Sequence, residues 1–457
     1  MTDSHRLLAL SPLDGRYATK VNSLNHIMSE YGLIRYRIIV EITWLTTLCE
    51  HPSIATTPLD SLELDYLHAI IDQFSIEDAA KIKQIEKTTN HDVKAAEYFL
   101  QDKLNQHPTL GNRIPLIHFA ATSEDINNLA YALMLKDGRQ VIADECSKII
   151  QSLGDMAKSY ADLAMLSRTH GQTASPTTLG KEIANVLVRL KRELAHLQRC
   201  DILGTFNGAV GNYNAHVTAY PEIDWFHFTQ HFVEDLGLTF NPMTTQIEPH
   251  DGLAQLLDNL ARINTILIDL NKDMWSYISL DYFILQKQAD EVGSSTMPHK
   301  INPIDFENSE GNLGIANALA THLARSLPIS RLQRDLSDST ALRNLGSVFG
   351  YSLLAYSACL KGLSKVTANQ AVITNDLEAR WEVLAEAIQT VLRRYGVQDA
   401  YESLKELTRG KVISQTSLHE WLQQQPLPQP AKDQLIALTP TTYTGLASTL
   451  AVKYLDD

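Results

Sequence analysis

The sequence has few cysteines, and their positions suggest neither a disulfide framework nor a zinc site. Cys49, Cys146, Cys200 and Cys359 are widely separated in a chain of 457 residues. They form no CxxC pair and no Cys/His spacing typical of metal ligands. We therefore expect no disulfide bonds and no structural metal.

Long apolar runs and basic clusters are also missing. No stretch approaches about 18 consecutive apolar residues, and the N-terminal segment MTDSHRLLALSPLDGRY lacks the apolar run of a signal peptide. The formal net charge is −14, without a basic stripe. These features predict a cytoplasmic protein that binds neither nucleic acid nor membranes. A small anionic substrate remains compatible with them, because only its pocket has to be positive.

The composition is that of a folded protein with more than one domain. Hydrophobic residues make up 44% of the chain and charged residues 20%, as in ordinary globular proteins. A chain of 457 residues is too long for one core, so two or three domains are expected.

Apolar residues spaced alternately three and four apart predict long helices. The clearest pattern runs from Leu253 to Tyr277 and predicts a helix of roughly 36 Å. Similar patterns join Ile183 to Leu197, and Ile315 and Leu319 to Leu323. Such helices need partners for their apolar faces, and no window alternates as a strand should. We predict an all-α fold whose central domain is an elongated helical bundle.

Periodicity and the distribution of proline and glycine suggest three helical domains. An N-terminal domain is expected over residues 1–111, and the long-helix bundle over residues 112–366. Shorter, more broken patterns predict a C-terminal domain over residues 367–457.

Six polar segments interrupt the periodic regions and hold the candidate functional residues. They are DGRY from Asp14, TTNHDVK from Thr88, TSEDINN from Thr122, SRTHGQ from Ser167, GSSTMPHKINP from Gly293 and QRDLSDSTALRN from Gln333. Segments so far apart in the sequence can form one site only if long helices, or different subunits, bring them together.

The segment from Gly293 to Pro303 is the most informative. Its Gly and Pro residues exclude a regular helix or strand. As a loop it offers amides, hydroxyls and a cation that could bind a carboxylate, although a polar surface connection has the same composition. It resembles the signature loop of the aspartase/fumarase superfamily, whose members release fumarate by β-elimination. MPHKxNP, with His299 and Asn302, is most similar to the adenylosuccinate lyase branch, and the similarity extends from DGRY to QRDLSDST.

β-Elimination needs a base, a clamp for the carboxylates and an acid. His170 is suited to proton donation because histidine titrates near neutral pH, and RTHGQ resembles the superfamily segment that carries the general acid, with Thr169 adding a hydroxyl. The resemblance assigns the base to Ser294, with Ser295 as the alternative. It implies a clamp formed by Lys300, Asn302, Thr122 and Ser123. Taken without the resemblance, a structural or solvent-facing histidine and an exposed surface lysine explain these residues better than catalysis does.

The remaining segments offer groups that suit a nucleotide. Arg16, Tyr17, His91, Ser339 and Arg343 supply cations and hydroxyls for a phosphate. The resemblance places Arg334 near the ribose, Asn90 and Asp92 beside the substrate, and Gln246 near the succinyl group. Taken singly, each arginine could equally be part of a solvated helix face.

The resemblance thus implies cleavage of adenylosuccinate to AMP and fumarate, and of succinyl-aminoimidazole-carboxamide ribotide, in purine nucleotide synthesis (AMP and IMP biosynthesis). It implies no metal or other cofactor, and a homotetramer whose sites draw on three chains. An argininosuccinate lyase, aspartase or fumarase would share the loop but need no phosphate site. A crystallin-like structural protein would be expected to have lost His170 or the loop.

Overall fold

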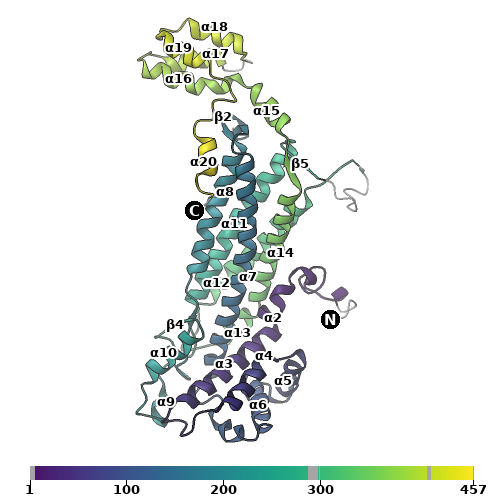
Figure 1. The fold of residues 1–457 in the computed structure, drawn as a ribbon, viewed down its shortest axis with the longest axis vertical. Helices are drawn as coiled ribbons and strands as arrows, with labels where there is room; N and C mark the ends of the chain where they lie inside the picture. The colour runs from purple at the N-terminus through teal and green to yellow at the C-terminus, as the bar shows by residue number, and fades with distance from the viewer. Residues whose placement is uncertain (1–5, 287–296, 298, 409–412, 456–457) are drawn as a thin grey trace. The chain divides into compact units, whose positions relative to one another are not determined.

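A computed structural model describes residues 6–286, 297, 299–408 and 413–455. Within these residues most of the chain is helical, and the strands form three separate two-stranded sheets. The predicted all-α class is confirmed (Figure 1). None of the described helices combines the length and apolar character needed to cross a bilayer.

The chain divides into two compact units assembled from distant segments. The first unit contains Met1–Glu145, Glu193–Thr265 and Gly311–Tyr356; the second contains Cys146–Arg192, Ile266–Glu310 and Ser357–Asp457. The division falls inside five long helices: α7 (Ser123–Ser159), α8 (Leu179–Arg199), α11 (Asp251–Ser279), α12 (Ile304–Ser326) and α14 (Leu345–Ser364). The three-domain division predicted above, with boundaries at 111 and 366, stays a prediction.

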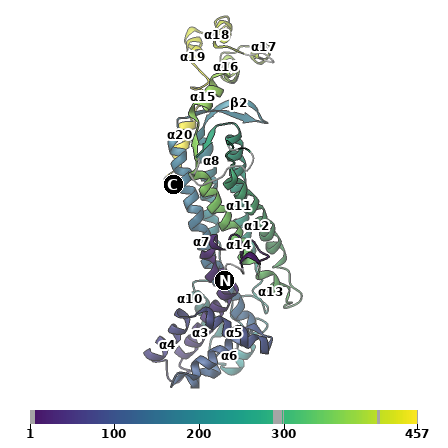
Figure 2. The same cartoon turned by 90° about the vertical axis from the view of Figure 1, so that its right-hand side faces the viewer.

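In the first unit, four helices near the N-terminus enclose their own apolar core. They are α3 (Glu30–Glu50), α4 (Ser61–Asp72), α5 (Ile76–Thr89) and α6 (Asp92–Asn105), and they lie together in each view (Figure 2). Ile38, Leu67 and Leu104 are among their fully buried side chains. Reciprocal capping boxes at Asp60 and Ser75 define where α4 and α5 begin.

The other elements of the first unit are short. They are η1 (Ala18–Lys20), η2 (Asn22–Leu24), α2 (Asn25–Met28), η3 (Leu110–Leu116), α9 (Asn214–Ala219), α10 (Trp225–Asp235), α13 (Ser337–Leu342), and the parallel pair β3 (Leu203–Gly204) and β4 (Thr239–Phe240).

The long helices are where the apolar patterns predicted them. The residues from Leu253 to Met274 that define the pattern of α11 are buried, as are those of α8. A few buried polar pairs fix the helices against one another. In the first unit Asn264 of α11 donates to Ser352 Oγ of α14 at 3.1 Å. In the second, Asn271 of α11 donates to Ser309 Oγ of α12 at 2.9 Å.

The apolar face expected for α12 was partly wrong. Ile315 is 46% exposed, whereas Leu313, Ala316 and Ala320 are buried, together with the predicted Leu323. Ala316 and Ala320 take the inward positions because small side chains allow helices to approach closely. The buried residues of α12 and the line of apolar residues through Ile315 have similar spacing, so spacing alone could not show which of the two faces the core.

The second unit contains a hairpin that the sequence patterns did not predict. Strands β1 (Ala164–Thr169) and β2 (Gln172–Thr178) pair antiparallel. Thr169 pairs with Gln172, and His170 and Gly171 between them have φ values of 54° and 72°. Two central residues with positive φ are typical of a tight hairpin turn. Much of the hairpin is exposed, so its strands show little alternation between polar and apolar residues.

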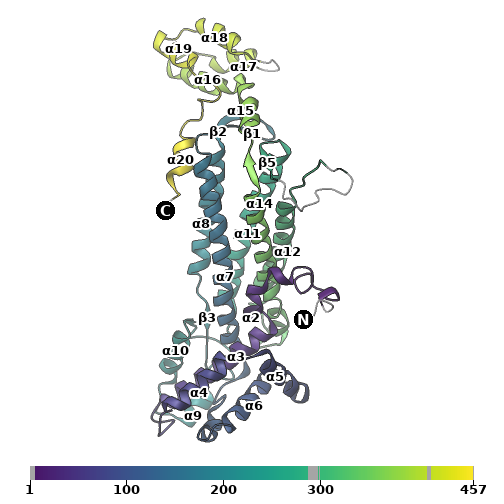
Figure 3. The same ribbon diagram turned by 45° about the vertical axis from the view of Figure 1, so that its right-hand side comes forward.

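The C-terminal helices of the second unit surround another apolar core. The remaining elements are β5 (Phe283–Leu285) paired with β6 (Val366–Ala368), α15 (Gln370–Glu378), η4 (Trp381–Leu384), α16 (Ala385–Arg394), α17 (Ala400–Thr408), α18 (Gln415–Gln423), α19 (Gln429–Ile436) and α20 (Ala447–Lys453). Helices α16 to α19 lie together, with α15 beside β1 (Figure 3). Leu377, Leu392 and Leu422 are fully buried in this core.

Candidate active site

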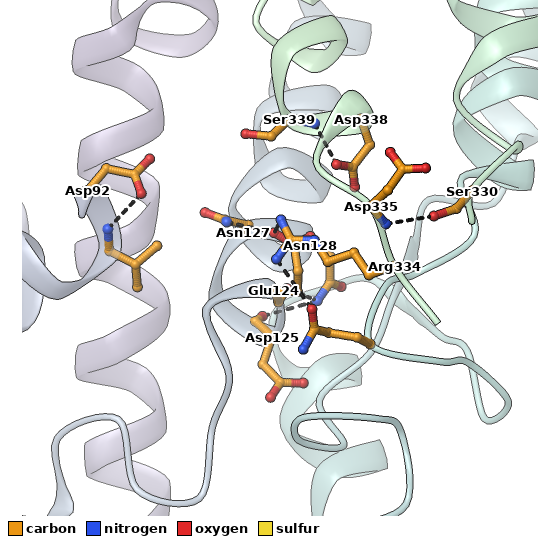
Figure 4. A network of polar contacts seen from close by, with 12 residues as sticks. Asp92, Glu124, Asp125, Asn127, Asn128, Ser330, Arg334, Asp335, Asp338 and Ser339 are labelled. Atoms are coloured by element: carbon orange, nitrogen blue, oxygen red, sulfur yellow. Dashed lines mark hydrogen bonds and ion pairs between the residues drawn. The ribbon is translucent and has the colours of Figure 1, made fainter. Parts of the chain in front are cut away.

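The first unit holds a continuous network of charged and amide side chains. Arg334, which follows α12, donates through Nη2 to Glu124 Oε1 of α7 at 2.8 Å. The same oxygen accepts from Asn127 Nδ2 at 2.8 Å. Figure 4 shows Glu124, Asn127 and Arg334 gathered at this point. Burial raises the pKa of Glu124, against the opposing effects of Arg334 and Asn127.

The network extends from Asn127 to Asp92 through a buried arginine. Arg37 of α3 donates through Nε to Asn127 Oδ1 at 2.9 Å and through Nη2 to Asp92 Oδ2 at 2.7 Å. Arg343 Nη2 reaches the same Asp92 oxygen at 3.2 Å. Burial by itself would raise the pKa of Asp92. The charge and hydrogen bond of Arg37, helped by the Val93 N–H and the charge of Arg343, outweigh burial and the pKa is lowered.

Arg343 also lines a cavity in this unit. Its Nη1 donates to Glu30 Oε2 at 2.5 Å. The cavity has a volume of about 320 Å³, and Asp14, Ser29, Glu30 and Ser347 are among the residues that line it. Asp14 belongs to the DGRY segment, so two of the predicted polar segments meet at this cavity.

The other predicted nucleotide residues occupy helix ends and turns of the first unit. Asn90 ends α5 in the left-handed conformation, and His91 caps α6 by accepting from Lys94 N at 3.0 Å. Arg16 is exposed, with its guanidinium carbon 5.7 Å from the centre of the Tyr17 ring. Ser339 lies in the first turn of α13, where its backbone N–H donates to Asp338 at 2.6 Å.

Thr122 and Ser123 lie at the start of α7 beside a fully buried carboxylate. Asp125 accepts from the backbone N–H groups of Thr122, Asn207 and Gly208, at distances of 2.8 to 3.1 Å. Burial raises the pKa of Asp125 to about 6, even though these donors lower it. Gln246 also belongs to this unit, and its Oε1 is 3.4 Å from Arg334 Nη1.

In the second unit, His170 is exposed at the tip of the β1–β2 hairpin, next to the exposed Thr169. No described residue forms a hydrogen bond with its ring. The hairpin is fixed further down by Arg168, whose guanidinium donates to Tyr282 Oη at 2.8 Å and to the carboxylate of Asp376. Burial, followed by the hydrogen bond to Asp376, raises the pKa of Tyr282 to about 12.

The signature loop lies only partly within the described residues. Ser294 and Ser295 are outside them, whereas His299 and Lys300 are exposed and Asn302 is partly buried. Gln286, before the loop in the sequence, and Asp305, after it, both contact Lys365. Its Nζ lies 2.8 Å from Asp305 Oδ2, and its carbonyl accepts from Gln286 N at 2.8 Å.

The structure therefore brings part of the predicted site together. Asp92, Gln246, Arg334 and Arg343 share one network, with Thr122 tied to Asp125 nearby in α7. The network does not include His170, Thr169, Lys300 or Asn302, which belong to the second unit.

Sequence reasoning missed Arg37, Glu124, Asp125 and Asn127. Three of these lie in the polar segment TSEDINN, which was a usable signal. Arg37 lies inside a helix without any motif. Among the described residues, no group of His, Cys, Asp and Glu side chains is arranged to hold a metal ion.

Comparison with known proteins identifies the family. Residues 15–317 match a family described as "Lyase", and residues 330–444 match "Adenylosuccinate lyase C-terminal". The adenylosuccinate lyase of Escherichia coli strain K12 is 54% identical over 97% of this chain and 98% of its own length. That of Haemophilus influenzae is also 54% identical, over 98% of both chains.

Solved structures support the fold. A fumarate lyase from Mesorhizobium sp. BNC1 superposes with a TM-score of 0.76 at 18% identity, covering 95% of this chain and 97% of the other. A 3-carboxy-cis,cis-muconate lactonizing enzyme from Pseudomonas putida gives 0.73 at 21% identity, over 95% and 96%. At such low identities the likeness concerns the fold alone. The two family matches and the near-full-length relatives together place this chain in the adenylosuccinate lyase family.

Proposed function

We propose that the protein releases fumarate from adenylosuccinate, leaving AMP, and from succinyl-aminoimidazole-carboxamide ribotide, in purine biosynthesis. The relatives at 54% identity over nearly the full chain support this activity. The structural observation that carries it is the network of Asp92, Arg334 and Arg343 in one unit. A fumarase or aspartase would have no phosphate or ribose for these cations to bind.

The nucleotide end of the substrate is proposed to bind in the first unit. Arg343 pairs with Glu30, which is about as exposed as Arg343 itself, so a phosphate can replace this partner at little cost. Arginine binds phosphate through two parallel hydrogen bonds. Ser339, Arg16, Tyr17 and His91 are the other proposed phosphate ligands. Arg334 would bind the ribose, with Asn90 and Asp92 beside the substrate.

The succinyl end is proposed to be held by Lys300, Asn302, Thr122, Ser123 and Gln246. Removing the proton next to a carboxylate increases the negative charge on that carboxylate. Donors already aimed at this charge lower the barrier, and losing one commonly costs about 3 to 4 kcal/mol. The exposed Lys300 is available for this role.

The elimination needs one proton removed and one delivered. Ser294, or alternatively Ser295, takes a proton from the CH2 carbon of the succinyl group, which is bonded to the carbon that bears the leaving nitrogen. The electron pair left on the CH2 carbon forms the new double bond as the C–N bond breaks. His170 then gives a proton to the departing purine nitrogen. Its place at an exposed hairpin tip without a described partner suits a group that completes a site elsewhere.

The assembly is proposed to be a cytoplasmic homotetramer whose sites each combine residues from several subunits. Ile304 and Ile315, exposed on α12 of the single chain, are apolar surface that neighbouring subunits would cover. A mechanism that needs His170 and Ser294 from different chains would then depend on assembly.

A panel of substrates tests the proposal. The purified protein is incubated separately with adenylosuccinate, argininosuccinate, aspartate and malate, and fumarate is followed by its absorbance. The proposal expects rapid fumarate release from adenylosuccinate, with stoichiometric AMP. No release from adenylosuccinate, or faster release from another member of the panel, would overturn it.

A further inference from the structure

We propose that Arg37 is a positioning residue for nucleotide binding: it holds the groups on which both Arg334 and Arg343 depend. The inference rests on the proposed function, because it presumes that those two arginines bind the nucleotide. Arg37 itself is only 3% exposed, so it acts through its neighbours rather than on the substrate.

The hydrogen bonds run in both directions from one guanidinium. Nη2 of Arg37 binds Asp92 at 2.7 Å, and Asp92 in turn binds Arg343 at 3.2 Å. Nε of Arg37 binds Asn127 at 2.9 Å. Asn127 and Arg334 then share Glu124 Oε1, each at 2.8 Å. A change at Arg37 therefore reaches the proposed phosphate and ribose ligands by separate routes.

Arg37 also limits how strongly Asp92 holds Arg343. The Asp92 oxygen lies closer to Arg37 than to Arg343, at 2.7 against 3.2 Å. Without the charge of Arg37, Asp92 would keep only Arg343 among the described cations that pair with it, whereas Glu30 would still pair with Lys83 at 3.1 Å. A phosphate would then have to compete with two carboxylates for Arg343. Removing Arg37 should thus weaken nucleotide binding without removing any nucleotide ligand.

The contacts with Asn127 and Asp92 require an arginine at position 37 rather than a positive charge alone. Nε and Nη2 lie on the same edge of a planar group, so Arg37 meets Asn127 and Asp92 with fixed geometry. A lysine has one nitrogen on a flexible chain and cannot reproduce both contacts. Arg37→Lys should retain the attraction to Asp92 but release Asn127, whereas Arg37→Met should lose both.

The experiment compares Arg37→Lys and Arg37→Met with a control on the same helix. Tyr36 is also buried, and its hydroxyl donates to Asp137, which is outside the network. Tyr36→Phe therefore removes a buried hydrogen bond from α3 without touching Asp92 or Asn127. For each full-length protein, the inhibition constants of AMP and of fumarate are measured in the fumarate-release assay, together with the melting temperature.

We expect the AMP inhibition constant to rise about tenfold in Arg37→Lys and more in Arg37→Met, the scale of a lost charged hydrogen bond. The fumarate constant and the Tyr36→Phe values should stay within about twofold of the wild type. Arg37→Lys and Arg343→Gln combined should weaken AMP binding by less than the product of their separate effects, because both act through Asp92.

A purely structural role would give a different result. The inference would be overturned if the inhibition constants of AMP and fumarate changed equally, or if the changes followed the melting temperature. Effects on AMP binding that multiply in the double variant would also overturn it. If the Arg37 variants do not fold, Asn127→Ala, which breaks only the route to Glu124, must raise the AMP constant. An inactive wild-type protein would refute the proposed function, whereas an active one with unchanged AMP constants refutes only the role of Arg37.

Discussion

Arg168, which lies two residues before His170 in the sequence, donates through Nη1 to the hydroxyl of Tyr282 at 2.8 Å. The same guanidinium contacts Asp376, which also accepts from Tyr282 at 2.5 Å. Arg168 thus ties the β1–β2 hairpin to the start of β5 and to α15. The exposed tip bearing His170 is supported by three mutually bonded side chains, of which Tyr282 is buried and Arg168 and Asp376 are partly buried.

Tyr282→Phe should lower kcat by roughly fivefold with little change in KM. Removing the hydroxyl breaks its hydrogen bonds with Arg168 and Asp376. We take the resulting loosening of the hairpin as about 1 kcal/mol, and it matters for proton delivery more than for nucleotide binding. Steady-state kinetics of fumarate release check this. Tyr66→Phe, which breaks a phenol hydrogen bond to Lys103 O in the first unit, should leave both constants unchanged. A Tyr282→Phe effect confined to KM would contradict the expectation.

Lys365→Met should destabilise the protein, whereas Lys361→Met should not. Both lysines face Asp305, but Lys365 is buried and 2.8 Å away, whereas Lys361 is about half exposed and 3.5 Å away. Removing one partner of a buried ion pair typically lowers the free energy of unfolding by about 3 kcal/mol or more. Removing one partner of an exposed pair lowers it by less than about 1 kcal/mol. Thermal unfolding of the two variants tests this difference in stability, and equal melting temperatures would contradict the prediction.

The two lysine variants should also differ in catalysis. The side chain of Lys365 contacts Asp305, which follows the segment containing Ser294. The hydrogen bond of Lys365 with Gln286 is made by the backbone carbonyl and should survive the substitution. We expect kcat to fall in Lys365→Met while the AMP inhibition constant is retained. Wild-type kcat in a folded Lys365→Met protein would show that the contact between Lys365 and Asp305 does not matter for turnover.

The contribution of His216 to the stability of the protein should fall between about pH 6.5 and pH 4, whereas the raised pKa of Asp125 acts in the opposite direction. His216 is fully buried, and burial lowers its pKa from 6.5 to about 4. In this range the unfolded chain takes up a proton at His216 that the folded chain does not. The resulting stability is complete above the unfolded pKa and decreases by up to about 3 kcal/mol as the pH falls.

His216→Phe should remove most of that pH dependence. Denaturant unfolding at a series of pH values would show that the wild type loses stability relative to His216→Phe as the pH falls. His227→Phe serves as the control, because the ring of His227 is exposed and its stability curve should follow that of the wild type. An unchanged slope in His216→Phe would mean that other groups cause the acid sensitivity.

Two inactive variants should restore activity when their subunits are mixed, if sites are shared. In His170→Gln and Ser294→Ala proteins, reshuffled subunits would form some sites with both native residues. Fumarate release after confirmed exchange measures this. No recovery would place the two residues on one chain, as would full activity in a sample that light scattering shows to be monomeric.

The helices could be predicted from sequence because their apolar faces are local patterns. The residues from Leu253 to Met274 are buried as expected. The prediction that Ile315 is buried was wrong because two apolar stripes on α12 have similar spacing, and only packing selects between them. The hairpin bearing His170 was missed because its turn depends on the φ values of two residues.

The site was predictable only where residues fall in distinctive polar segments. Asp92, Arg334 and Arg343 lie in such segments and share one network, and their roles at the substrate stay predictions. Arg37 was not, because its role depends on Asp92 and Asn127, which are 55 and 90 residues away. No local pattern distinguishes a buried, paired arginine from one on a solvated helix face.

The most direct test of the account is the rate of fumarate release from adenylosuccinate in the His170→Gln protein and in a Ser294→Ala, Ser295→Ala double variant. Proton transfer by a positioned side chain typically contributes at least about 100-fold. The account predicts losses of that size or more in both proteins, with AMP still bound at near-native affinity. Fumarate release at the native rate by either protein would contradict it.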